Sequence, residues 1–454
     1  MSNTVAKYQK YAKYKDSGTD WLGEIPTHWD VQPTKRFFRL IAEPAPENND
    51  YELLSVYTEI GVKPRKELEQ KGNKASTTDG YWLVKKGDIV VNKLLAWMGA
   101  VGYSEYDGVT SPAYDILRPT KKLNPKFYHY LFRTKIANME FKRWSRGIME
   151  MRLRLYFDEL GRIAMPFPTY EEQNEIVDFL DHETTKIDSL IEKQQKLIEL
   201  LKEKRQAVIS HAVTKGLNPD VPMKDSGVEW LGQVPEHWTV AKIKHLSKII
   251  SKGTTPTTMG GEFVTEGVRF LKAENIGKSP TVNPFPEFYI TENVDAQLSR
   301  SRLEENDVLV IIAGATTGLS SVLQKDLLPA NTNQAVSFIR PKETAYAKWV
   351  AYWLSTQFAQ SLIWMGAVQA AQPNLSMENL GNINITLPSV EEIDQLLIVV
   401  DKKLSQIDKL IQRNIKAIEL IKERRTALIS SAVTGKINVT NWQHPNEAKT
   451  ELSS

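Results

Sequence analysis

Two stretches of the chain carry apolar residues at an alternating spacing of four and three, with Lys and Glu at most of the positions between them. This spacing is typical of a long helix that buries one narrow stripe in a coiled coil. Pro168 and Gly216 flank the first stretch, and Pro388 and Gly435 flank the second, as expected at helix ends. The predicted seam residues are Ile187, Ile191, Gln194, Ile198 and Leu201 in the first helix and Ile407, Ile411, Asn414, Ile418 and Ile421 in the second.

A helix of about 45 residues is about 65 Å long, and an exposed apolar stripe of that length needs a partner helix. Because the nearest candidate is the other stretch, we predict that the two helices pair as an antiparallel coiled coil. Gln194 and Asn414 occupy equivalent polar positions in the seam. They either fix the register of the pair, as a buried Asn does in other coiled coils, or are polar residues tolerated near a frayed seam.

The two helices belong to an internal repeat of the whole chain. Over the 45 positions from Glu171 to Lys215, 20 residues recur at an offset of 220. Another segment, 16–31, recurs at 225–240 with 10 identities in 16 positions, and two tryptophans are among the identical residues. Between these repeated segments the halves hardly align. The pattern therefore indicates two copies of one scaffold that carry two different variable regions.

In the variable regions the pattern changes to short apolar runs separated by turns. Segments 88–91 and 307–312 are each predicted to form a buried strand after a turn. Segments 127–141 and 349–362 have helical spacing, and each is predicted as one helix. We predict an α+β fold with an internal pseudo-two-fold repeat, divided into a first variable domain (1–167), a first helix (168–216), a second variable domain (217–387), a second helix (388–436) and a C-terminal tail (437–454).

The composition narrows the class of protein. Because 58 Lys and Arg face 55 Asp and Glu, the net charge is only +3, and a site for a polyanion must come from a local cluster of cations. The absence of cysteine excludes disulfides, thiolate metal sites and a Cys nucleophile. The N-terminus lacks the apolar run of a signal peptide, and no run approaches the roughly 20 residues of a membrane helix, so we expect a cytoplasmic protein without a membrane partner.

The first variable domain contains a cluster of cations. From Lys121 to Arg162, eleven Lys or Arg face four acidic residues, which gives a local net charge of +7. Arginines interleaved with Trp144 and Tyr156 suit contacts to phosphate and bidentate recognition of guanine, although a solvated helix face would show the same charges. The candidate DNA-binding residues of this domain are Asn92, Lys93, Ser111, Tyr114, Arg143, Arg146, Arg152 and Arg154.

The second variable domain is less basic and rich in amide and hydroxyl side chains. Asn and Gln pair well with adenine edges, but these residue types also form turns, and both interpretations stay open. The candidate DNA-binding residues of this domain are Thr254, Thr255, Asn275, Thr316, Thr317, Asn331, Asn333, Gln334, Gln372 and Asn374.

The chain lacks the motifs of enzymes that act on DNA. The run Gly314–Gly318 has no lysine and so is not a phosphate-binding loop, and 283–286 does not match the Asn-Pro-Pro-aromatic motif of base methylation. The seven histidines lack the spacing of metal ligands, and His28 and His237 are expected to pack and hydrogen bond at the entry of each domain. We expect no catalytic residue, no metal and no cofactor in this chain.

The junction between the two halves resembles that of the specificity subunits of type I restriction-modification enzymes. It reads Asn-Pro-Asp-Val-Pro-Met-Lys-Asp-Ser-Gly-Val-Glu-Trp-Leu-Gly from Asn218 to Gly232, followed by Pro-Glu-His-Trp from Pro235 to Trp238. The resemblance covers nearly the whole chain, because the helix pair, the Val-Thr endings at 213–214 and 433–434 and the two unlike domains also fit that family.

This resemblance implies a non-catalytic reader of double-stranded DNA. Its two target recognition domains would each read one half of a split, asymmetric site, and the helix pair would set the spacing between the halves. It also implies two partners: two methylation subunits that use S-adenosylmethionine on adenine, and restriction subunits that use ATP and Mg²⁺ for translocation and cleavage.

Two other classes of protein remain open from the residues alone. A coiled-coil adaptor with two protein-binding domains would explain the near-neutral net charge. A nuclease with an unrecognised site is the second alternative. Steep loss of DNA affinity with salt, together with a split sequence preference, would exclude the adaptor, and metal-dependent cleavage by the isolated chain would reveal the nuclease.

Overall fold

The computed structural model describes residues 8–67, 78–149, 152–367 and 374–443. The chain divides into two compact units that are not consecutive in sequence. Unit 1 comprises Met1–Gln195 and Lys416–Ser454, and unit 2 comprises Lys196–Ile415. Two long helices, α4 (Tyr170–Lys215) and α10 (Val390–Val433), each contribute one part to each unit.

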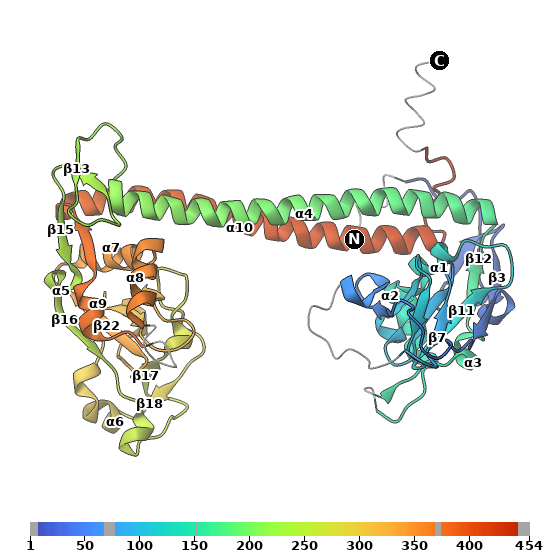
Figure 1. The fold of residues 1–454 in the computed structure, drawn as a ribbon, viewed down its shortest axis with the longest axis horizontal. Helices are drawn as coiled ribbons and strands as arrows, with labels where there is room; N and C mark the ends of the chain where they lie inside the picture. Colours follow the sequence, from blue (N-terminus) through green and yellow to red (C-terminus); the bar gives the residue numbers. More distant parts are fainter. Residues whose placement is uncertain (1–7, 68–77, 150–151, 368–373, 444–454) are drawn as a thin grey trace. The chain divides into compact units, whose positions relative to one another are not determined.

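Unit 1 contains a variable region of short strands and three helices (Figure 1). Its strands are β1 (Tyr14–Asp16), β2 (Glu24–Pro26), β3 (Asp30–Pro33), β4 (Phe38–Ile41), β5 (Leu54–Tyr57), β6 (Gly61–Pro64), β7 (Trp82–Val84), β8 (Ile89–Asn92), β9 (Val101–Tyr103), β10 (Gly108–Thr110), β11 (Tyr114–Pro119) and β12 (Ala164–Phe167). Its helices are α1 (Pro125–Phe132), α2 (Lys135–Trp144) and α3 (Phe157–Leu160).

Unit 2 has the same kind of variable region. Its strands are β13 (Met223–Asp225), β14 (Gln233–Pro235), β15 (Thr239–Lys242), β16 (Ser247–Lys252), β17 (Val268–Leu271), β18 (Tyr289–Ile290), β19 (Val308–Ile311), β20 (Ser320–Val322), β21 (Ala330–Thr332), β22 (Val336–Pro341) and β23 (Asn384–Leu387). Its helices are α5 (Ile243–Leu246), α6 (Glu292–Gln297), α7 (Thr344–Leu354), α8 (Gln357–Ala367) and α9 (Met377–Asn382).

The sheets of the two units share one frame. A four-stranded antiparallel sheet runs β4-β11-β8-β9 in unit 1 and β16-β22-β19-β20 in unit 2, so the strand order is the same. Small antiparallel pairs also correspond, β1-β2 with β13-β14 and β3-β12 with β15-β23. The units differ in their additions, which are β5-β6 and β7-β10 in unit 1 and the sheet β18-β17-β21 in unit 2. The predicted α+β fold with an internal repeat is confirmed.

A buried ion pair recurs at the same place in both sheets. Arg118 on β11 makes two hydrogen bonds of 2.8 Å to the carboxylate of Asp88, which directly precedes β8. In unit 2, Arg340 makes two bonds of 2.9 Å to Asp307, which directly precedes β19. Burial raises the pKa of Asp307, and the bonds from Arg340 oppose that shift. Each pair links the turn before one strand (β8 or β19) to the neighbouring strand in the sheet (β11 or β22).

Each unit contains an antiparallel pair formed by one part of α4 and one part of α10. In unit 1, Arg425 bonds to Asp188 at 2.9 and 3.1 Å, and in unit 2, Arg205 bonds to Asp408 at 3.0 Å. The ten predicted seam residues are all buried or half-buried, whereas most of their neighbours are exposed. The predicted antiparallel coiled coil is confirmed.

The polar seam residues do not form the cross-helix bonds that a register-fixing role requires. Asn414 donates to the carbonyl of Leu410 in its own helix at 2.8 Å, and Oε1 of Gln194 is buried without a hydrogen-bond partner among the described residues. The Arg–Asp pairs do cross between the helices.

The predicted single helices at 127–141 and 349–362 are each two helices. The first is divided between α1 and α2 at Thr134, whose hydroxyl accepts a bond from the backbone N of Ala137 at 3.2 Å. The second is divided between α7 and α8 at Thr356, which accepts from Ala359 at 3.2 Å. A threonine cap satisfies the free N–H groups of a new helix, so the break is stable even though the apolar spacing continues across it.

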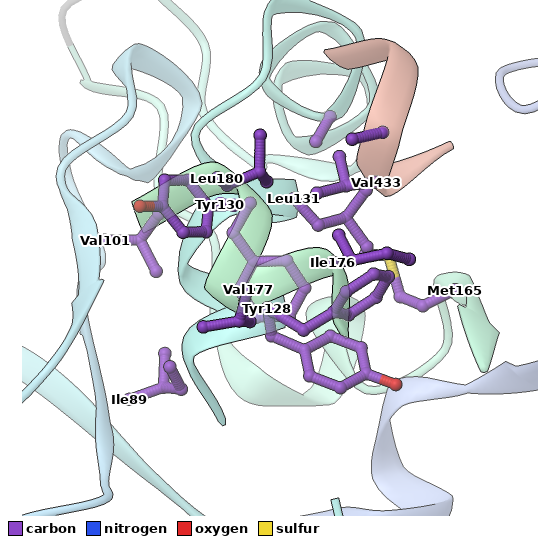
Figure 2. Close-up of a cluster of buried hydrophobic side chains, with 14 of the residues drawn as sticks. Ile89, Val101, Tyr128, Tyr130, Leu131, Met165, Ile176, Val177, Leu180 and Val433 are labelled. Carbon is purple, nitrogen blue, oxygen red and sulfur yellow. The ribbon is translucent and has the colours of Figure 1, made fainter. Parts of the chain in front are cut away.

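The variable region of unit 1 shares one core with its long helices. In Figure 2, Tyr128 and Leu131 of α1 lie among Ile176 and Leu180 of α4, with Val433 of α10 beside them. At the edge of this core the hydroxyl of Tyr130 donates to Asp181 on α4 at 2.6 Å. Unit 2 repeats this contact, because Tyr352 on α7 donates to Asp401 on α10 at 2.6 Å. The long helix is thus a structural part of each domain.

The repeated His-Trp segments attach to the starts of the long helices. His28 Nε2 lies 2.9 Å from a carboxylate oxygen of Glu172, and His237 Nε2 lies 2.9 Å from one of Glu392. The two units differ beside this contact: Trp238 donates its indole N–H to Glu392 at 3.0 Å, whereas in unit 1 Tyr11 donates to Glu172 instead. The expected packing role of the two histidines agrees with these contacts.

No helix within the described residues is long and apolar enough to cross a membrane. Within the same residues, no group of three His, Asp or Glu side chains could hold a metal ion.

Candidate DNA interface

Two loops end at equivalent anchor points on the common frame of the two units. The first variable loop, residues 145–154, follows α2, and the second variable loop, residues 367–374, follows α8. The first is anchored where Leu155 donates its backbone N–H to the carbonyl of Lys93, directly after β8, at 2.9 Å. In the second, Leu375 donates to Ile312, directly after β19, at 2.7 Å. The described end of each loop therefore lies beside the start of the segment that joins β8 to β9 in unit 1 and β19 to β20 in unit 2.

The two variable loops differ in chemistry. The first reads Ser-Arg-Gly-Ile-Met-Glu-Met-Arg-Leu-Arg and carries three cations, whereas the second reads Ala-Val-Gln-Ala-Ala-Gln-Pro-Asn and carries amides and no charge. The structure describes 145–149 and 152–154 of the first, and Ala367 and Asn374 of the second. Gln372 lies outside the described residues.

The first variable loop is a tight hairpin. Arg146 and Arg154 exchange two backbone hydrogen bonds of 2.9 Å, and Arg152 donates its backbone N–H to Met149 at 2.8 Å. A Cβ atom on Gly147 would lie 2.6 Å from the carbonyl oxygen of Arg152, so only glycine fits this close approach. The hairpin fixes the backbone from which the predicted arginines project.

The four predicted arginines are exposed and differ in how far they are neutralised. Arg146 lies 2.6 Å from the buried carboxylate of Glu159, and Arg143, at the end of α2, lies 3.6 Å from Glu140. Among the described residues no carboxylate forms an ion pair with Arg152 or Arg154. These two cations are therefore the most available to an anionic partner.

A half-buried arginine supports the loop between β8 and β9. The guanidinium of Arg133 donates to the carbonyls of Gly99 and Val101 at 3.3 and 3.2 Å, and to Thr58 at 2.8 Å. Burial lowers the pKa of Arg133 to about 10. The group is therefore still protonated at neutral pH and links this loop to the segment after β5.

The structure contradicts the assignment of Asn92 and Lys93 as base contacts. Asn92 is buried, and its side-chain oxygen accepts from the backbone N of Leu94 at 3.1 Å. Nζ of Lys93 donates to the carbonyl of Pro112 at 2.9 Å and lies 3.3 Å from Asp115. Burial raises the pKa of Asp115, and Lys93 opposes this shift. Both side chains support the loop rather than project from it.

Ser111 and Tyr114 lie on the turn before β11. The hydroxyl of Ser111 accepts from the backbone N of Ala113 at 3.2 Å, and Tyr114 packs half-buried against the core of the sheet. Their assignment as DNA contacts stays a prediction.

In unit 2 the structure contradicts three of the assignments. Asn275 is buried, and its amide donates to the carbonyls of Asn283 and Pro286 at 3.0 and 2.9 Å. The hydroxyl of Thr317, also buried, donates to Gly314 at 2.7 Å.

Asn331 is the third. It is 0% exposed, and its amide donates to Asp295 at 3.0 Å while its oxygen accepts from Ser301 at 2.7 Å. All three polar side chains are fully used within the fold, so they are not available to a base edge.

The remaining candidates of unit 2 gather on two loops. Thr254, Thr255, Asn333 and Gln334 lie where the segments after β16 and β21 meet, and Thr255 donates its hydroxyl to Gln334. Thr316 is exposed in the loop between β19 and β20, and Asn374 is exposed and pairs through its backbone with Ala313 at the start of that loop. Asn374 therefore corresponds in position to the arginine hairpin, and Thr316 corresponds to the loop between β8 and β9.

Sequence reasoning missed the apolar residues of the unit 1 surface. Ile148 and Met149 are exposed at the tip of the hairpin, and Leu94, Leu95 and Met98 are exposed in the loop between β8 and β9. Apolar residues directly beside arginines in a loop were a signal in the sequence, because loop residues without a core to bury them are usually polar.

Comparisons with known proteins identify the family of the chain. The model of the type I restriction modification DNA specificity domain matches twice, at residues 30–201 and 235–422. The specificity subunit of the type I restriction enzyme MjaVIII from Methanocaldococcus jannaschii is 25% identical, with 92% of this chain and 95% of that protein covered. The specificity subunit of EcoBI from Escherichia coli is 22% identical over 81% of this chain and 77% of that protein.

Two solved structures share the fold. A chain from a study of complex assembly and conformational transition of the type I R-M system matches with a TM-score of 0.68 and 13% identity, covering 90% of this chain and 98% of that one. The HsdS subunit from Thermoanaerobacter tengcongensis matches with a TM-score of 0.55 and 14% identity, over 91% and 98%. The two matches of the domain model together span well over half of the residues of this chain. The chain therefore belongs to the type I restriction-modification DNA specificity family.

Proposed function

We propose that this chain is the non-catalytic DNA-reading subunit of a type I restriction-modification complex and that it reads a bipartite, asymmetric site, one half with each unit. The observation that carries this proposal is the pair of variable loops. They follow equivalent helices and are anchored by equivalent backbone bonds, yet one offers guanidinium groups and the other amides. A reader of two unlike half-sites requires the same platform twice with different side chains.

Unit 1 is suited to a half-site that is contacted through phosphates and guanine. Arg152 and Arg154 are exposed on the hairpin and are not neutralised by a described carboxylate. Arginine binds phosphate oxygens and pairs with O6 and N7 of guanine in the major groove. Unit 2 presents Asn374 at the corresponding place, with Thr316 in the loop between β19 and β20, and an Asn amide pairs with N6 and N7 of adenine.

The chemistry of the complex would reside in its partners. We propose two methylation subunits that transfer a methyl group from S-adenosylmethionine to adenine, and restriction subunits that use ATP and Mg²⁺. The lack of a phosphate-binding loop and of a methylation motif in this sequence supports that division, and so does the similarity to specificity subunits of type I restriction enzymes. The cytoplasm, where such a complex would meet the chromosome, is the proposed location.

The test of this function is selection of bound sequences from a random duplex library by the chain in complex with its methylation subunits. The proposal predicts one split motif with two unlike halves and a fixed spacer. Selection of no motif, with an affinity for DNA that changes little with salt, would favour the coiled-coil adaptor instead.

We also propose that α4 and α10 fix the length of the spacer between the half-sites. Seven residues inserted at matched positions in both helices keep the seam in phase, because the heptad is the repeat of the coiled coil. The selected motif should then keep both halves and lengthen its spacer. The matched control is a heptad of the same composition inserted after Gln443, an exposed residue outside the helices, where the spacer should not change.

A further inference from the structure

Two adjacent apolar residues of the arginine hairpin, Ile148 and Met149, are exposed. Ile148 is 101% exposed and Met149 is 51% exposed, between Gly147 and the arginines of the returning strand. Single exposed apolar residues are common on proteins, but two adjacent large ones in a loop are typical of a contact surface.

The backbone presents these side chains in a defined way. The hairpin is closed by the two bonds between Arg146 and Arg154, and Gly147 approaches the carbonyl of Arg152 so closely that no side chain fits between them. Leu155, which follows the hairpin, is buried and bonded to Lys93. The tip is therefore anchored at its base to the sheet of unit 1.

The charge around the tip identifies the partner. Between Lys142 and Arg154 there are five cations and one acidic residue, Glu150. An apolar tip surrounded by cations is complementary to a surface with an anionic rim and an apolar interior, and the phosphates and stacked bases of duplex DNA form such a surface.

We propose that Ile148 and Met149 form an apolar wedge that enters the base stack of the half-site read by unit 1 and unstacks one base-pair step. This inference rests on the proposed function and adds to it a specificity-determining element. Unstacking costs least at flexible pyrimidine–purine steps, so the wedge would select the sequence at that step without a hydrogen bond to a base edge. The arginines at the base of the hairpin would hold the phosphates on either side.

The experiment uses the complex with its methylation subunits and a duplex that carries its own split site. The fluorescent base 2-aminopurine replaces one base at a time along both halves, with the methylated adenine left unchanged. The test variant is Ile148→Ala/Met149→Ala, and the rescue variant is Ile148→Leu/Met149→Leu. The matched control is Met139→Ala on α2, which removes an apolar side chain that is 65% exposed outside the hairpin.

The wild type, the rescue variant and the control should show a several-fold rise in fluorescence at one step of one half-site. The alanine variant should lose this rise and bind the site about tenfold more weakly, because it cannot replace the lost stacking. All four proteins should have the same circular dichroism spectrum, since none of the changed side chains is buried.

Unchanged unstacking and affinity in the alanine variant would overturn the wedge. If the complex still bound its site and Arg152→Ala weakened that binding, the proposed function would stand without the wedge. Failure of the wild-type complex to bind duplex DNA would overturn both. Loss of assembly with the methylation subunits at unchanged DNA affinity would show that the tip binds protein, which also overturns the wedge.

Discussion

The two units show which parts of a DNA reader are fixed and which vary. Both keep the strand order of the central sheet, the buried Arg–Asp pair at its turn and the Tyr–Asp contact to a long helix. They differ in the loops at the edge of that sheet, where one carries exposed arginines and the other amides. These three internal contacts are shared, whereas the exposed side chains of the loops have diverged. The fixed contacts allow the loops to change without loss of the frame.

The largest effect is expected when the shared ion pair is broken. Arg118→Ala leaves Asp88 buried without its partner, and Arg340→Ala does the same to Asp307. Each change should lower the free energy of unfolding of its own unit by about 3 kcal/mol. Urea unfolding followed by hydrogen exchange, which resolves the two units, measures it.

The matched control for this prediction is Arg39→Ala. Arg39 lies opposite Arg118 in the register of β4 and β11 but is exposed, so its loss should change stability by less than about 0.5 kcal/mol. Equal losses for Arg118 and Arg39 would mean that the ion pair is not what holds the frame.

Acid should destabilise unit 1 more than unit 2 through one buried histidine. Burial lowers the pKa of His129 in unit 1 from 6.5 to about 3, whereas Ala351 occupies the equivalent position in unit 2. Below pH 6.5 the unfolded chain binds a proton that the folded chain does not, so the stability of unit 1 is fully present above pH 6.5 and falls toward pH 3. The slope contributed by this group is about 1.4 kcal/mol per pH unit.

Hydrogen exchange of each unit between pH 7 and pH 4.5 measures this difference. The variant His129→Ala should lose that part of the slope, whatever its stability at pH 7. A slope in unit 1 that is unchanged by this substitution would assign the acid sensitivity to other groups.

A smaller effect is expected at the variable loops. Arg152→Ala should weaken binding of the split site by about 1 kcal/mol and lower the slope of log affinity against log salt by about one, because one phosphate contact is lost. Asn374→Ala in the second variable loop should leave the salt slope unchanged, since no charge is removed. Titrations at several salt concentrations compare the two variants, and equal slopes for wild type and Arg152→Ala would remove Arg152 from the phosphate contacts.

The smallest effect is expected in the coiled coil. The pairs Asp188–Arg425 and Asp408–Arg205 are equivalent and partly exposed, so a double-mutant cycle to Ala should give a coupling of about 0.5 kcal/mol in each unit. A coupling near zero in one unit and not in the other would show that the helix pair is not equivalent in the two units.

The parts of the fold that the sequence predicted are those whose signal is periodic. The seam of α4 and α10 was found because Ile187 and Ile407 each begin a run of apolar positions with one spacing, and the repeat identified the two units. The division at Thr134 was missed because the apolar spacing of Leu131 and Ile136 continues across it, and only the cap shows the break.

The candidate site was harder to predict because a polar residue looks the same whether it faces solvent or a buried partner. Arg152 and Asn331 were both plausible DNA contacts, yet one is exposed and the other is used by Asp295 and Ser301. The partners of Asn331 lie about 30 residues away in sequence, so only the folded chain brings them together. The apolar tip at Ile148 needed the hairpin geometry to be recognised as exposed.

The most direct test is a map of methylated adenines across the genome of a strain that expresses the methylation subunits. The map is made with this gene intact, with the gene deleted, and with its first variable loop, residues 145–154, exchanged for another sequence. The account predicts one split motif in the intact strain, no methylation of it in the deleted strain, and a change confined to one half of the motif after the exchange. Identical maps in the intact and deleted strains would contradict the reading function. A change in both halves after the exchange would contradict the assignment of one half-site to each unit.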